Sequence, residues 1–283
     1  MDSKNILKKL DRIDDLPTLP EIAIQINKML QDYDTSIQDL SVTIEKDQAM
    51  VPKILKLVNS AFFGFKSKIS DISHAVMLLG FNTVRNAIVS IAIIEAFSVK
   101  KNIKGFDIKQ FWTHSVAVAI TSQYLAAESK LCNSSDAFTA GLLHDIGKIV
   151  LLRYFNDLFV KVWNLVNETE LSFCDAEKNE ISVTHARIGA HLAKKWQLPA
   201  NLVDTIKYHH KTNRNGNDYG LIMIVHVADI IVNGYLTNPK IKSPAIDPDA
   251  LKAVKTQIDT LPDWFPGVQE DVNSACRFFL EKV

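Results

Sequence analysis

Residues 141–150, GLLHDIGKIV, constrain the fold more than any other part of the chain, because they set a histidine beside an aspartate in a run that otherwise has the composition of a buried core. Burying an unpaired carboxylate is costly, so the fold must give Asp145 a partner. One possible partner is a divalent metal, since imidazole and carboxylate together suit zinc, iron, manganese or nickel. The other is local: Asp145 pairs with Lys148 three residues later, and His144 donates to a backbone carbonyl near a helix end.

Further histidines and a second aspartate favour the metal, because each lies in or at the end of a segment with helical spacing of apolar residues. Together with the first pair, the candidate ligands are His114, His144, Asp145, His185, His209, His210 and Asp229. Neighbouring side chains on a helix diverge by about 100°, so His144 and Asp145 can bind one ion or two adjacent ions. Two ions about 3.5 to 4 Å apart would activate a hydroxide and clamp a phosphate, and Lys148 could then neutralise a phosphate oxygen.

Several of these residues also have a purely structural interpretation. His185 could be a satisfied core histidine, and the doublet His209 and His210 could cap the C-terminus of a helix, where the dipole favours imidazolium. Asp229 lies among apolar residues and needs a partner, which His226 could supply from one turn away. The residue types and their spacing leave both interpretations open.

The fold class follows from the periodicity of the whole chain. Apolar residues recur at helical spacing almost throughout, and helix caps stand at Ser36, with Asp39 three residues on, and at Asp247. The sequence lacks segments of alternating apolar and polar residues joined by Asn-Gly or Asp-Gly turns, which would predict β-hairpins, so we expect an all-α protein. The charged, glycine-ended stretch 99–105 is the expected boundary between lobes. We therefore expect an N-terminal helical lobe (1–105), a metal-binding helical bundle (106–240) and a C-terminal helical extension (241–283).

Composition narrows the classes of partner. The chain has 32 basic and 32 acidic residues, so it lacks the positive excess that nucleic acids or anionic membranes attract, and we expect neither as a partner. Cys132, Cys174 and Cys276 are widely spaced and odd in number, which favours reduced thiols. The N-terminus lacks the pattern of a signal peptide, and the longest apolar runs are too short to span a bilayer. These features predict a soluble cytoplasmic protein.

The order of the candidate ligands resembles that of the HD superfamily of metal-dependent phosphohydrolases, which the chain matches at His114, His144, Asp145 and Asp229. The remaining three histidines are similar to the additional ligands of the HD-GYP branch, which hydrolyses cyclic dinucleotides. The chain departs from HD-GYP proteins at Lys211, where that branch has an acidic residue, and residues 213–219 contain no Gly-Tyr-Pro. Gln110 stands where some members carry a metal-binding glutamate, which disfavours a third ion.

Three N-terminal blocks resemble the HDOD family, the HD-related output domains of bacterial signalling proteins. They are LPTLPE (16–21), EKDQAMVPKILKLVNSA (45–61) and HAVMLLGF (74–81), and the resemblance extends from about residue 10 to about residue 240. It implies an all-helical protein in which an N-terminal lobe packs against an HD-like bundle. HDOD proteins resemble regulatory or scaffolding modules and often lack part of the metal set, whereas this chain keeps it.

The resemblance implies a regulatory protein of bacterial signal transduction with two divalent ions, iron, manganese, zinc or nickel, in an HD-type site. Its partner would be another signalling protein or a small phosphorylated ligand. The alternative is a metal-dependent phosphohydrolase or phosphodiesterase acting on a nucleotide or phosphate ester, with Asp145 and Lys148 as the catalytic residues. Catalysis needs an open coordination position and a cleft, whereas a structural site is closed.

Overall fold

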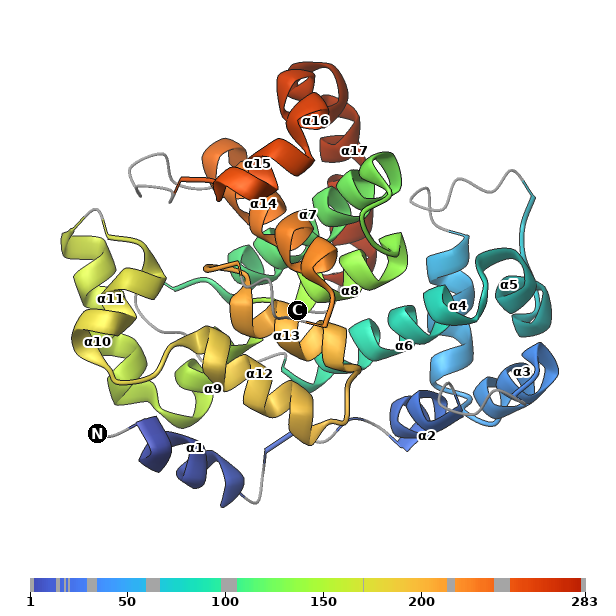
Figure 1. Ribbon diagram of the computed structural model, residues 1–283. Coiled ribbons are helices and arrows are strands. Elements are labelled where there is room, and N and C mark those ends of the chain that lie inside the picture. Colours follow the sequence, from blue (N-terminus) through green and yellow to red (C-terminus); the bar gives the residue numbers. More distant parts are fainter. Residues whose placement is uncertain are drawn as a thin grey trace. The chain divides into compact units, whose positions relative to one another are not determined.

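The computed structural model describes residues 3–13, 16–17, 19, 21–29, 35–59, 67–97, 106–169, 171–212, 217–236 and 245–280. All the regular elements of these residues are α-helices (Figure 1), which confirms the predicted fold class. The helices are α1 (Ser3–Asp11), α2 (Glu21–Met29), α3 (Ile37–Glu45), α4 (Met50–Val58), α5 (Ile72–Leu79), α6 (Phe81–Ala96), α7 (Ile108–Ser129), α8 (Ser134–Leu143), α9 (Ile146–Tyr154), α10 (Asn156–Glu168), α11 (Phe173–Glu180), α12 (His185–Lys195), α13 (Ala200–Tyr208), α14 (Tyr219–Leu236), α15 (Pro248–Ala253), α16 (Lys255–Asp259) and α17 (Leu261–Phe279).

The chain divides into two compact units, each built from two segments. Unit 1 comprises Met1–Pro17 and Ala117–Leu261, and unit 2 comprises Thr18–Val116 and Pro262–Val283. The first helix therefore belongs with the middle of the chain, and most of the last helix belongs with the N-terminal half. The boundaries predicted at residues 105 and 240 lie outside the described residues, and the division into three consecutive blocks stays a prediction.

In unit 2, helix α3 begins with the predicted cap. The Ser36 hydroxyl accepts a hydrogen bond from the backbone N–H of Asp39, and the Asp39 carboxylate accepts one from the N–H of Ser36, which completes a capping box. Helices α5 and α6 meet at Gly80, whose φ of +79° suits glycine, and the chain turns there by 113°. The predicted helix start at Ser36 is therefore confirmed.

In unit 1, helix α12 packs against both α9 and α13 (Figure 1). Two glycines, Gly147 and Gly189, permit the close approach of α12 to α9. A Cβ atom on Gly147 would stand 2.0 Å from the carbonyl oxygen of His185 and 2.8 Å from the nitrogen of Gly189. No side chain fits at those distances. The absence of a side chain at Gly147 thus lets the start of α12 reach the start of α9, where the predicted ligands lie.

Of the helices in the described residues, none is both long enough and apolar enough to cross a membrane by itself. Helices α5 and α6 meet that criterion only when they are taken together, across their 113° bend.

Candidate metal centre

The histidine and aspartate that adjoin in the sequence lie at the junction of two helices. His144 is the C-cap residue of α8 and Asp145 the N-cap residue of α9, and both side chains are buried. The flanking Leu143 and Ile146 are also buried, so the apolar run forms core on both sides of the junction. The sequence thereby places a carboxylate where water does not reach it.

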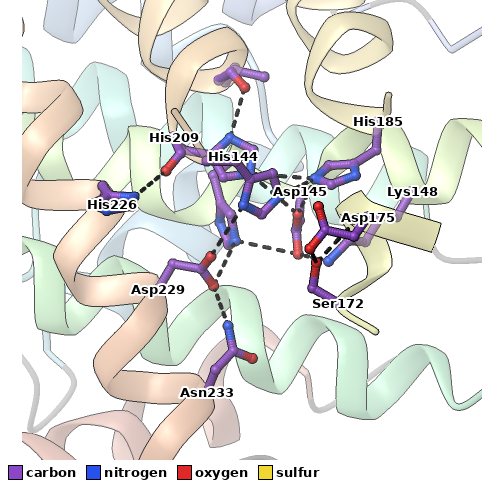
Figure 2. Close-up of polar contacts among 12 residues, drawn as sticks. His144, Asp145, Lys148, Ser172, Asp175, His185, His209, His226, Asp229 and Asn233 are labelled. Atoms are coloured by element: carbon purple, nitrogen blue, oxygen red, sulfur yellow. Dashed lines mark hydrogen bonds and ion pairs between the residues drawn. The ribbon is translucent and has the colours of Figure 1, made fainter. Parts of the chain in front are cut away.

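Three imidazoles converge on this carboxylate (Figure 2). The Nε2 atom of His185, the first residue of α12, lies 3.0 Å from Oδ1 of Asp145, and Nε2 of His209, at the end of α13, lies 3.7 Å from the same oxygen. The Nε2 atom of His144 lies 3.3 Å from the other oxygen, Oδ2. The two oxygens of Asp145 therefore face different histidines.

The remaining candidates of unit 1 extend the cluster on either side. Nε2 of His210 is 2.9 Å from Nε2 of His185. Asp229, on α14, has Oδ1 at 3.6 Å from Nε2 of His144, and that oxygen also accepts a hydrogen bond from Asn233. Figure 2 shows Asp229 and Asn233 below the histidines on the same helix. His210, next to His209 at the end of α13, and α14 thus contribute further donor atoms around Asp145.

These side chains have the composition and spacing of a metal site. Asp145, His185, His209 and His210 each offer one ligand atom, and these atoms all lie within 4.8 Å of one another. His144 and Asp229 form a second pair beside them. One carboxylate with three imidazoles is a donor set that suits zinc, iron, manganese or nickel, so the residues fit a divalent transition metal.

The seventh candidate, His114, lies on α7 in unit 2, three residues before Ala117, where the second segment of unit 1 begins. Its ligation of a metal stays a prediction.

Each of the three deeply buried histidines is held through its Nδ1 atom. Nδ1 of His144 donates to the carbonyl of Gly141 at 2.6 Å, and Nδ1 of His209 donates to the carbonyl of Ile206 at 2.8 Å. Nδ1 of His185 lies 2.7 Å from Oε2 of Glu177, a buried residue of α11. Since oxygen acceptors require a proton on Nδ1, Nε2 is the nitrogen left to bind a metal.

The charges of the cluster follow from its burial. Burial, together with the neighbouring histidines, lowers the pKa of His209 well below its usual value and that of His210 to about 3, so both imidazoles are neutral. Burial would raise the pKa of Asp145, but His144 and Lys148 outweigh it and hold that pKa well below normal. Two neutral imidazoles and an ionised carboxylate are in the protonation states that metal ligation requires.

His144 is the contrasting member of the cluster. Burial opposes its protonation, yet the Asp145 and Asp229 carboxylates prevail and raise the pKa of His144 to about 10. A cation at this position is therefore stabilised by both carboxylates, whether it is the proton on His144 or an ion that replaces it.

Lys148 and His210 form the less buried side of the cluster. The Lys148 ammonium lies 2.5 Å from Oδ2 of Asp145 and 5.1 Å from the centre of the Phe173 ring, with 18% of its side chain exposed. The side chain of His210 is 22% exposed. Both contacts of the local interpretation, Lys148 with Asp145 and His144 with a carbonyl, are thus present alongside the converging histidines.

His226 has a different role from the one suggested by its spacing to Asp229. Its Nδ1 donates to the carbonyl of His209 at 2.7 Å, and its Nε2 accepts from the backbone N–H of Asp247 at 3.1 Å. The last carbonyls of α13 have no donor within the helix, and the His226 side chain supplies one. His226 therefore links the end of α13 to the start of α15.

Comparison with known proteins gives consistent results. The family model for the HDOD domain matches residues 16–212. An uncharacterized protein of Treponema pallidum is 30% identical over 224 residues, which cover 78% of this chain and 43% of that protein. Ribonuclease Y of Deinococcus radiodurans is 27% identical over 157 residues, which cover 56% of this chain and 21% of that protein. The chain thus spans less than half the length of these two relatives.

A solved structure matches nearly the whole chain. The crystal structure of an HDOD domain protein of unknown function from Geobacter sulfurreducens is 25% identical, with a TM-score of 0.79. The match covers 96% of this chain and 98% of that one. The helical architecture is therefore that of an experimentally determined HDOD protein.

Proposed function

The chain belongs to the HDOD domain family, and on that premise we propose that it is a bacterial signal-transduction regulator whose HD-type site holds two divalent transition-metal ions. The observation that carries the proposal is the position of Asp145 between two groups of ligands. Its Oδ1 faces His185 and His209, and its Oδ2 faces His144. A carboxylate placed in this way can bridge two ions.

The proposal assigns the ligands to two positions. His185, His209 and His210 would hold one ion with Oδ1 of Asp145, and His144 and Asp229 would hold the other with Oδ2. We assign His114 to the second position. This assignment follows the order of ligands in the HD superfamily, which the chain resembles and in which His114 precedes His144 and Asp145.

The output of such a site would be a change in a contact with another signalling protein or with a small phosphorylated ligand. The regulatory assignment rests on the family and on the burial of the cluster, since His144, Asp145, His185 and His209 are almost inaccessible to solvent. We place the protein in the reducing cytoplasm, in keeping with its three free cysteines.

Metal content tests the proposal directly. The protein would be purified without chelator or a histidine tag, and its metal measured beside that of an Asp145→Ala variant whose helical content matches. We expect about two equivalents of iron, manganese, zinc or nickel in the wild type, with a loss of both in the variant. A wild type that binds none of the four metals on reconstitution would overturn the proposal.

A second candidate function, hydrolysis of a phosphate ester or nucleotide, is favoured by the position of Lys148. This ammonium lies beside Asp145 on the less buried side of the cluster, where it could neutralise a phosphate oxygen. The similarity to ribonuclease Y over 157 residues points to the same chemistry. Bound ions would supply an activated water and a clamp for the phosphate. Hydrolysis of bis(p-nitrophenyl) phosphate by the metal-loaded wild type, lost in Asp145→Ala, would support it, and inactivity toward phosphomonoesters, phosphodiesters and nucleotides would exclude it.

A further inference from the structure

We infer that Glu177 is a positioning residue for one of the two proposed metal ions, the one held by His185, His209 and His210. The inference rests on the proposed metal site. Glu177 lies on α11 and is fully buried. Both of its oxygens are engaged by one residue: Oε1 accepts from the backbone N–H of His185 and Oε2 pairs with Nδ1 of the same residue, each at 2.7 Å.

The position of His185 in its helix explains why it needs a partner from another element. His144 and His209 stand at helix ends, so each donates to a carbonyl three residues earlier in its own helix. His185 is the first residue of α12 and has no preceding turn. Its N-cap, Thr184, makes no side-chain capping bond, and the carboxylate of Glu177 takes over that task.

One side chain therefore performs two tasks. By accepting the backbone N–H it caps α12, and by accepting from Nδ1 it fixes the orientation and tautomer of the imidazole. The Nε2 atom is then directed at Oδ1 of Asp145 and at Nε2 of His210, at 3.0 and 2.9 Å. A carboxylate that accepts from Nδ1 also makes the imidazole a stronger electron-pair donor to a metal than a backbone carbonyl does.

The inference predicts a selective effect. Glu177 touches the ring of His185 and neither His144 nor Asp229, whose contacts lie on the other side of Asp145. Loss of the Glu177 charge should lower the affinity of the site for one ion and leave its affinity for the other unchanged. In Glu177→Gln the amide can accept only through its single oxygen, so one of the two His185 N–H groups would face an N–H donor.

The test is a titration of metal-free protein with Co²⁺, in which binding is monitored through the visible absorption of the bound ion. We expect two binding steps in the wild type, and in Glu177→Gln a loss of about 10- to 100-fold in the affinity of one step. Glu180→Gln is the matched control, because Glu180 is an exposed residue of the same helix and should leave both steps unchanged.

The outcomes separate this inference from the proposed function. A wild type that binds no Co²⁺ would overturn the metal site itself. A wild type with two steps, both unchanged in Glu177→Gln, would overturn the role of Glu177 alone, even if the melting temperature of the metal-free variant fell. If Glu177→Gln does not fold, Glu177→Asp carries the test, because it keeps the charge but is too short to reach both N–H groups, and one step should again weaken.

Discussion

Gly147 lies directly against the backbone carbonyl of His185, where an added Cβ would stand only 2.0 Å from the oxygen. The obstructing atom is backbone, so neither helix can relieve the clash by a rotamer change. We expect Gly147→Ala to lower the free energy of unfolding by about 3 kcal/mol or more, and to weaken metal binding because His185 moves with α12. Urea denaturation measures the first effect.

Gly234 provides the matched control, since it also lies in a helix of unit 1 but has nothing within 4 Å of an added Cβ. Gly234→Ala should raise the free energy of unfolding by about 0.5 to 1 kcal/mol, because alanine is the better helix former. Equal effects of the two substitutions would show that the contact between α9 and α12 is not tight.

Removal of metal should destabilise the protein. An ion that binds only the folded state raises the free energy of unfolding by about 2.7 kcal/mol when its free concentration is 100 times the dissociation constant. We therefore expect a chelator to lower the melting temperature of the wild type and to leave that of Asp145→Ala unchanged. Calorimetry with and without EDTA makes the comparison, and an equal shift in both proteins would contradict ligation by Asp145.

The pH dependence of stability should include a contribution from Asp247. Partial burial would raise the pKa of Asp247, but hydrogen bonds from Thr212 and from the first N–H groups of α15 prevail and lower it below 3.8. A depressed pKa in the folded state means that the stabilisation is present above pH 3.8 and is lost as the pH falls through the folded-state value.

Asp247→Asn tests this contribution, because asparagine keeps the capping oxygen and removes the charge. We expect the free energy of unfolding of the variant to be about 1 kcal/mol lower than that of the wild type at pH 7. This difference in stability should shrink below pH 3.8. Urea denaturation at a series of pH values measures it, and a difference that grows in acid would contradict the assigned sign.

Much of the site could be predicted because the informative residues are polar side chains in apolar helical segments. A buried histidine and aspartate require partners, and the other candidate ligands of unit 1 stand out by the same criterion. Helix ends such as that at Ser36 could be predicted as well, since a cap is a local pattern. These predictions depend only on residues that are close together in the sequence.

Glu177 and the glycine contact could not be predicted, because their roles depend on how separate helices pack. Nothing near Glu177 distinguishes it from the exposed Glu180 until α11 is placed against α12. For the same reason, the spacing of His226 to Asp229 suggested a contact within one helix, whereas the ring of His226 turns toward the carbonyl of His209 on another. Pairing across helices is a property of the tertiary structure.

Lys148 distinguishes metal binding from recognition of a phosphorylated ligand, because it contacts Asp145 but is not itself among the candidate metal ligands. We expect Lys148→Met to keep both ions and to bind inorganic phosphate about 10- to 100-fold more weakly, as the loss of one charged hydrogen bond implies. Calorimetric titration of the manganese-loaded protein with phosphate measures the change. Lys178→Met is the control, since Lys178 makes a similar pair with Asp175 but is largely exposed. Unchanged phosphate affinity in Lys148→Met would show that the ammonium only neutralises Asp145, and loss of the metal would show that it supports the site.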